Sequence, residues 1–169
     1  MQPNLIVKKS GIAGQGVFTT VNFKAGQLIT ALIGRRMSME EMIKTVDAGL
    51  EAGSDPLQIG DETYLDLEEL YRSINHSCDP NSYISGENKL KALKAIKPGE
   101  EITFDYSTTM NDNEAKLLES DSILWTCKCK CGAKNCRKII DQFKTLPQCR
   151  QKFYLDNKLA PDFILKKFG

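Results

Sequence analysis

The stretch Arg72-Ser-Ile-Asn-His-Ser-Cys-Asp-Pro-Asn81 is the part of the chain around which the remaining motifs can be ordered. It contains the only histidine, His76, with an amide side chain before it and a thiol two residues after it. Pro80 disfavours a helical backbone at the preceding residue, so the stretch should end extended or in a turn. Further along lies Gly99-Glu-Glu-Ile-Thr-Phe-Asp-Tyr106, in which residues 101–106 alternate as in a strand and end on an aromatic side chain.

The size and composition of the chain are those of one ordinary globular domain. Its 169 residues are enough to bury about two-thirds of the unfolded surface. Hydrophobic residues make up 41% and charged residues 27%, which is typical of soluble proteins. No apolar run approaches the roughly 20 residues of a membrane span, and the first residues lack the apolar core of a signal peptide. We therefore expect an intracellular protein with no membrane partner.

The net charge of +1 conceals two halves of opposite sign. Residues 1–127 hold 12 Lys/Arg against 19 Asp/Glu, whereas residues 128–169 hold 11 against 3. One interpretation is two solvated surfaces that attract each other. The other is an acidic body that receives a basic peptide, with the basic tail packed over it. The charges alone leave both open.

Six cysteines in an intracellular chain favour metal binding over disulfides. Four of them, Cys127, Cys129, Cys131 and Cys136, lie within ten residues. Cys-x-Cys spacing is poor geometry for a mutual disulfide but suits thiolates that converge on one ion. Cys149 is expected to be a plain buried thiol.

The hydrophobic patterns predict many short strands and few helices. Ser38 and Glu41 form a capping box in front of an amphipathic helix over Met39–Leu50, and Asp66 and Glu69 repeat the pattern before a short helix that reaches Arg72. Further helices are expected over 147–158 and 161–168. The expected strands cover residues 5–7, 28–33, 57–59, 63–65, 82–85, 90–95 and 101–106. The fold class is therefore mostly β.

Four motifs in this order resemble the SET-domain family of protein-lysine methyltransferases: the glycine loop Gly11–Phe18, Asn75-His76, the segment ending at Tyr106, and the cysteine run. The resemblance covers about residues 5–137. It implies several small β-sheets with a threaded, pseudoknot-like segment, one inserted helix and a helical C-terminus. The implied divisions are a SET domain at 5–107 with the inserted helix at 38–50, a connector at 108–124, a post-SET zinc segment at 125–140 and C-terminal helices at 146–168.

Lysine methylation requires a neutral amine in line with a sulfonium, although a free lysine has a pKa near 10.4. A narrow, dry channel favours the neutral amine by desolvation, and alignment of the reacting atoms supplies much of the remaining rate. The resemblance implies that the Tyr106 hydroxyl orients the amine. It also implies that Phe104, on the same face, sets how many methyl groups fit, and phenylalanine here favours di- or trimethylation.

The resemblance further implies one site for the methyl donor, S-adenosylmethionine. Its residues are Gly14, Gln15, Gly16, Arg72, Asn75, His76 and Tyr106. Ser73 departs from the family pattern, which usually has an aromatic residue there. One structural zinc is implied on Cys78, Cys129, Cys131 and Cys136. Cys127 is an extra thiol, and its replacing Cys78 as a ligand remains an open alternative.

These features predict methylation of lysine side chains in a histone or another basic protein. The expected location is the nucleus or chromatin in a eukaryotic or host-directed setting, and otherwise the cytoplasm. The alternative is a zinc-containing interaction module that binds protein or nucleic acid through its tail without catalysis. Its phosphate contacts would be Lys128, Lys130, Lys134, Arg137 and Lys138. The tail lacks the interleaved aromatics of a stacking platform, so direct nucleic-acid binding is not favoured.

Overall fold

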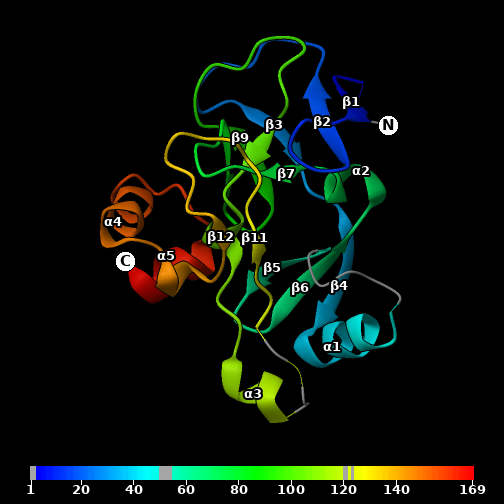
Figure 1. The fold of residues 1–169 in the computed structure, drawn as a ribbon, viewed down its shortest axis with the longest axis vertical. Coiled ribbons are helices and arrows are strands. Elements are labelled where there is room, and N and C mark those ends of the chain that lie inside the picture. Colours follow the sequence, from blue (N-terminus) through cyan, green and yellow to red (C-terminus); the bar gives the residue numbers. More distant parts are fainter. Residues whose placement is uncertain (1–2, 50–54, 120–121, 123) are drawn as a thin grey trace.

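The computed structural model describes residues 3–49, 55–119, 122 and 124–169, and it shows several small sheets rather than one large one (Figure 1). Two three-stranded antiparallel sheets have the orders β3-β9-β8 and β4-β6-β5, and three further sheets are pairs. The strands are β1 (Leu5–Lys9), β2 (Gln15–Thr19), β3 (Leu28–Ala31), β4 (Gly34–Ser38), β5 (Pro56–Gly60), β6 (Thr63–Leu67), β7 (Asn75–His76), β8 (Ser82–Ser85), β9 (Lys89–Ala92), β10 (Thr103–Phe104), β11 (Cys127–Lys128) and β12 (Ile139–Ile140).

The helices are short and lie around the sheets. They are α1 (Met39–Asp47), α2 (Glu69–Arg72), α3 (Glu114–Glu119), α4 (Gln148–Asp156) and α5 (Asp162–Phe168), with 3₁₀ turns η1 (Tyr106–Thr109) and η2 (Phe143–Thr145). In Figure 1, α1 and α3 lie at one end, and the C-terminal pair α4 and α5 lies along one side. Within the described ranges, every helix is too short or too polar to cross a bilayer. The expected mostly β class with a helical C-terminus is confirmed.

A parallel pair of strands brings the two decisive motifs together. β7 pairs with β10, so that Asn75 lies opposite Thr103 and His76 opposite Phe104. Parallel neighbours cannot be joined by a tight turn, and here the connection contains the β8–β9 hairpin. This pairing places the Asn75-His76 motif directly beside the segment that ends at Tyr106.

Three groups of buried side chains stabilise these sheets. The largest joins β2, β3, β5, β6, β8 and β9 and includes the fully buried Val17, Ile84 and Leu90. A second lies beneath α1, around Met37 and Tyr64. A third, around Phe143, Tyr154 and Ile164, packs the C-terminal helices together. The C-terminal region therefore has a core of its own.

Some expected elements differ in extent from those observed. The run over 28–33 is not one buried strand: β3 ends at Ala31, β4 begins at Gly34, and Leu28 and Ile33 are both 48% exposed. An apolar run indicates burial only where another layer covers it, and neither side chain is covered here. The connector contains α3, and the strand expected over 101–106 is regular only at Thr103–Phe104.

Helix starts were predicted with mixed success. The capping box of Ser38 and Glu41 is present at α1, while residues 50–54, where this helix was expected to end, lie outside the described residues. α2 has Glu68 at its N-cap with no side-chain capping bond, whereas Asp66, the predicted cap, lies within β6 and pairs with Arg72. Cys149 is exposed rather than buried.

Candidate active site and thiol cluster

Tyr106 lies at the start of η1 with its hydroxyl committed to a single acceptor. The phenol donates to the Ile74 carbonyl at 2.6 Å, and the Tyr106 backbone N–H donates to His76 Nδ1 at 3.2 Å. Burial raises the pKa of Tyr106, so the phenol stays protonated at neutral pH. Since its proton faces Ile74, the remaining lone pairs of the hydroxyl oxygen are left to accept from another group.

Aromatic rings surround Tyr106 at the edge of a largely apolar cavity of about 490 Å³. The Phe104 ring centroid lies 4.8 Å from that of Tyr106, and the Trp125 centroid lies 6.5 Å away. The rings of Phe104 and Tyr106 lie close together although β10 ends at Phe104 and Tyr106 begins η1. Besides these rings, the lining includes Ile43, Val46, Leu57, Tyr71, Ile74 and Leu124. The apolar side chains of this lining disfavour an ammonium by desolvation, whereas the carboxylates of Asp47 and Asp55, which also line the cavity, attract cations.

Asn75 fixes the glycine loop against β10. Its side-chain amide donates to the carbonyls of Ala13 at 3.2 Å and Gln15 at 2.8 Å, and to Glu101 Oε1 at 2.8 Å. Ser10 donates to the same carboxylate at 2.8 Å. These bonds bring the loop, the Asn75 strand and the Glu101 segment to one place, as the three motifs predicted.

Two glycines of that loop are needed for different reasons. Gly14 has φ +45°, a left-handed conformation that side chains disfavour. A Cβ at Gly16 would lie 2.3 Å from Glu101 Oε1, so any other residue would displace this carboxylate from its bonds to Ser10 and Asn75. Gln15 begins β2 between them. The glycine spacing thus reflects one turn and one close contact.

Arg72 lies on the cavity wall with its guanidinium occupied by protein groups. It is paired with Asp66, and its Nε donates to the Leu67 carbonyl. Of the residues predicted to bind the donor, Arg72 and Tyr106 both line the cavity, and β6 holds the Arg72 side chain in place through Asp66 and Leu67.

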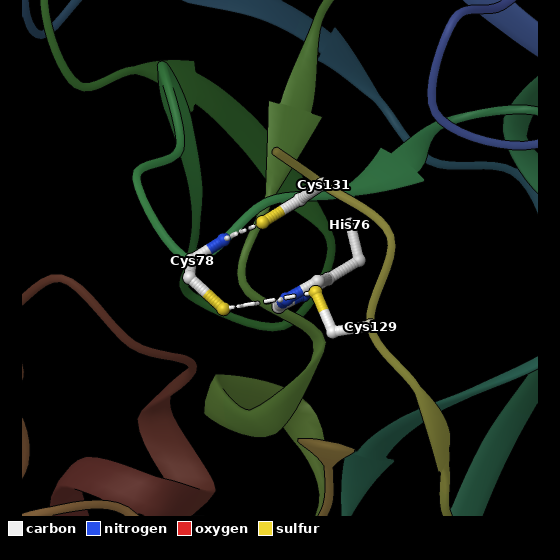
Figure 2. A group of neighbouring side chains, drawn as sticks. All are labelled: His76, Cys78, Cys129 and Cys131. Atoms are coloured by element: carbon white, nitrogen blue, oxygen red, sulfur yellow. Dashed lines mark hydrogen bonds between the residues drawn. The ribbon is translucent and has the colours of Figure 1, made fainter. Parts of the chain in front are cut away.

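The thiols of three cysteines and the ring of His76 converge beside η1 (Figure 2). We call His76, Cys78, Cys129 and Cys131 the thiol cluster; their ligand atoms all lie within 4.8 Å of one another. Cys78 Sγ lies 3.8 Å from Cys129 Sγ. Cys136 is not among these four residues, but its side chain interacts with both Cys129 and Cys131. Cys127 pairs with Ile140 in the β11–β12 ladder and is not among these atoms.

Backbone N–H groups point at the sulfurs, which suits thiolate ligands. Arg137 N lies 3.4 Å from Cys78 Sγ, Cys78 N 3.5 Å from Cys131 Sγ, and Lys138 N 3.4 Å from Cys136 Sγ. Burial raises the pKa of Cys131, but the N–H groups of Cys78 and Ala133 donate to its sulfur, and its pKa falls to about 7 overall. The sulfur and nitrogen atoms of the thiol cluster are the donor types that a structural zinc ion takes.

The tautomer of His76 follows from its neighbours. A backbone N–H can only donate, so Nδ1, which accepts from Tyr106, carries no proton. In the neutral ring Nε2 is then protonated and donates to Cys78 Sγ at 3.3 Å. Burial lowers the pKa of His76 to about 4, which keeps the ring neutral. His76 is thus arranged to orient a thiolate ligand rather than to bind a metal itself.

Comparison with known proteins agrees with this geometry. The SET domain family matches residues 14–107, more than half of the chain, and the chain belongs to that family. It is 30% identical over 148 residues to "Histone-lysine N-methyltransferase 2B" of Homo sapiens, and 31% identical over 155 residues to "Histone-lysine N-methyltransferase, H3 lysine-9 specific dim-5" of Neurospora crassa. These matches cover 80% and 73% of this chain, but only 5% and 47% of the relatives.

Solved structures support the same fold. One, described as "ctPRC2 in an autoinhibited conformation bound to S-adenosylmethionine", from Chaetomium thermophilum, gives a TM-score of 0.57 at 24% identity. The match covers 69% of this chain and 17% of the chain in the solved structure. The identity is low, so this likeness bears on the fold alone.

One buried polar group of the site was not predicted. The Asp105 carboxylate is completely buried and binds Arg137 and Tyr154. Asp105 precedes Tyr106 in the sequence, but nothing in the sequence indicates that a helix near the C-terminus supplies one of its partners.

Proposed function

We propose that this chain transfers methyl groups from S-adenosylmethionine to lysine side chains of a histone or similar basic protein. The observation that carries the proposal is the Tyr106 hydroxyl, fixed on the Ile74 carbonyl at the edge of an apolar, aromatic-lined cavity. Membership of the SET family and the names of the relatives support it. Since those relatives act on histone lysine, the nucleus is the proposed location.

The donor site is proposed at the junction of the glycine loop and β7. The residues proposed to hold it are Gly14, Gln15, Gly16, Arg72, Asn75, His76 and Tyr106. The bonds of Asn75 to the loop support this assignment, because they hold the loop backbone beside the segment that ends at Tyr106. The donor supplies an electrophilic methyl group on a sulfonium.

In the proposed reaction, the lysine amine enters the cavity neutral, its proton having passed to solvent, because the apolar walls disfavour the ammonium. The Tyr106 oxygen accepts an N–H of that amine and so directs its lone pair. The nitrogen forms the new N–C bond while the electrons of the S–C bond remain on sulfur. The product is a methylammonium ion, which then releases one proton to solvent.

Cys78, Cys129, Cys131 and Cys136 are the proposed ligands of one zinc ion. With His76 arranged as a donor to Cys78, these four thiols supply the complete tetrahedral set. The ion would fasten the cysteine segment, residues 125–140, to the core at Cys78. That segment begins at Trp125, which lines the cavity, and it includes Cys127.

Acidic groups at the cavity support a basic substrate. Asp47 and Asp55 both line it, and a peptide with Lys or Arg beside the target lysine would meet them. Of the two charge interpretations, an acidic body that receives a basic peptide is therefore favoured. Arg137, one of the phosphate contacts of the non-catalytic alternative, is instead paired with the buried Asp105.

The test of the proposed function is Tyr106→Phe, which removes one oxygen. The fold should lose about 1 kcal/mol, the usual contribution of one hydrogen bond. Turnover on histone peptides should fall about a hundredfold or more, because amine alignment is lost, while donor affinity changes little. Radiolabel transfer and calorimetric donor titration measure the two effects. Wild-type turnover in this variant would remove Tyr106 from the mechanism.

A further inference from the structure

The carboxylate of Asp105 connects three parts of the chain that are far apart in sequence. Its side chain is 0% exposed. Arg137 of the cysteine segment donates to it twice, from Nη1 to Oδ2 at 2.8 Å and from Nη2 to Oδ1 at 2.6 Å. The Tyr154 hydroxyl of α4 donates to Oδ2 at 2.8 Å. A buried carboxylate is tolerated only when paired and hydrogen-bonded, and Asp105 meets both conditions through these two partners.

Arg150, one turn before Tyr154 in α4, extends the connection to the thiol cluster. Its Nη2 donates to the Tyr154 hydroxyl at 2.8 Å and to the Cys78 carbonyl at 3.1 Å. Its Nε is buried with no hydrogen-bond partner within the described part of the chain. Arg150 therefore links Tyr154 to the backbone of Cys78 through Nη2.

Asp105 also determines how η1 begins. Its Oδ1 accepts from the Ser107 backbone N–H at 3.2 Å, so it acts as the N-cap of η1. Arg137 Nη2 donates to the Ser107 hydroxyl at 3.1 Å as well. Tyr106 is the first residue of this turn. A rotation of the carboxylate would therefore move the backbone that aims the Tyr106 phenol at Ile74.

We propose that Tyr154 and Arg150 act through Asp105 as positioning residues for methyl transfer, by holding the start of η1 and the cysteine segment together. This inference rests on the proposed function. Neither residue lines the cavity, so neither is a contact for the substrate. Both lie on α4, beyond residues 14–107 that match the SET family, and Figure 1 shows this helix at one side of the molecule.

Tyr154→Phe tests the proposal because it removes only the hydroxyl that bonds to Asp105. A displacement of about 1 Å at a reacting group can cost roughly a hundredfold in rate, and a smaller shift should lower kcat about tenfold. The KM for donor should stay within about twofold, because no donor contact is removed. Metal content should stay at that of wild type. Thr30→Val is the matched control, since it removes a buried hydroxyl of β3 that bonds to the Ala31 carbonyl at 3.1 Å; its kcat should be unchanged.

A second readout needs no activity. Trp125 is the only tryptophan of the chain, and its ring lies 6.5 Å from that of Tyr106, at the start of the cysteine segment. In metal-loaded Tyr154→Phe, acrylamide should quench Trp125 more strongly than in wild type, whereas in Thr30→Val it should not. Inactivity of the wild-type chain on all peptides would refute the proposed function, and the quenching would still decide the positioning role.

A double-mutant cycle tests the route through Asp105. If Tyr154 acts through this carboxylate, adding Tyr154→Phe to Asp105→Asn should lower kcat by less than about twofold further, because coupled residues are not additive. Should Asp105→Asn fail to fold, Arg150→Lys takes its place, with the same non-additivity expected. If Tyr154→Phe lowers kcat by the same factor with and without the second substitution, Tyr154 does not act through Asp105. A wild-type kcat, or wild-type quenching of Trp125, in Tyr154→Phe would overturn the proposal.

Discussion

At the scale of single residues, a hydroxyl group added to the Phe104 ring, beside Tyr106, would change the space available for methyl groups on the lysine amine. Phe104 is buried, with its ring 4.8 Å from that of Tyr106, and it carries no hydrogen-bonding group. A phenol at the same place would hold a hydroxyl, or a water bound to it, where methyl groups on the amine need room. We therefore propose that the phenylalanine favours products with more than one methyl group.

Phe104→Tyr should retain the first methylation and curb the later ones, because the added hydroxyl narrows the space around the amine. Mass spectrometry of a peptide product resolves one, two and three added methyl groups. Tyr83→Phe, in β8 and away from the cavity lining, is a suitable control for tyrosine–phenylalanine exchange. An unchanged methylation pattern in Phe104→Tyr would leave Phe104 as ordinary core.

A second prediction concerns Asn75, whose side-chain amide donates to the carbonyls of Ala13 and Gln15 and to the Glu101 carboxylate. Asn75→Ala removes these bonds, and the stabilisation of the protein by S-adenosylmethionine should disappear. Asn75→Asp should also lower the melting temperature of the donor-free protein below that of Asn75→Ala, because a carboxylate would face the Gln15 carbonyl and the Glu101 carboxylate at about hydrogen-bond distance. Thermal melts with and without millimolar donor measure both. A donor-induced shift of wild-type size in Asn75→Ala would contradict the assignment.

At the scale of elements, the cysteine segment is attached to the core by its thiols and by Arg137. The sulfurs of Cys129 and Cys131 reach Cys78, while the β11–β12 ladder holds Cys127 in another position. Sequence spacing left Cys127 and Cys78 as alternatives. The arrangement of the sulfurs favours Cys78.

Metal analysis of single cysteine variants separates these alternatives. Cys78→Ser and Cys136→Ser should each lower bound zinc well below one ion per chain, because a structural site needs all four ligands. Cys127→Ser should keep its zinc, and Cys149→Ser, an exposed thiol on α4, is the matched control. Zinc loss in Cys127→Ser with retention in Cys78→Ser would refute the proposed ligand set.

At the scale of the whole molecule, the main core and the C-terminal core are separate groups of buried side chains joined through the Asp105 network and the thiol cluster. Chelation should therefore release the cysteine segment while the main core stays folded. Methyl transfer and the protection of Trp125 from acrylamide should both fall, with far-ultraviolet circular dichroism largely unchanged. Loss of all three signals in one transition would show that the ion supports the entire fold.

Local patterns were sufficient wherever the interacting groups lie close in the sequence. The capping box of α1, the β8–β9 hairpin and the C-terminal helices follow from spacing and turn residues, and the structure confirms them. The ordered motifs also indicated the family, which the match to the SET domain model confirms. Each of these motifs consists of residues that are close together in the sequence, so it can be recognised without knowledge of the fold.

Pairings between distant segments could not be obtained in this way. Asp105 and Tyr154 are 49 residues apart, and Arg137, interpreted from its charge as a possible phosphate contact, is instead the partner of a buried carboxylate. Leu28 and Ile33 look buried by their pattern but have no layer above them, and Cys149 is exposed for the same reason. Burial and charge pairing depend on what packs against a residue, and that is a property of the assembled sheets and helices rather than of the local sequence.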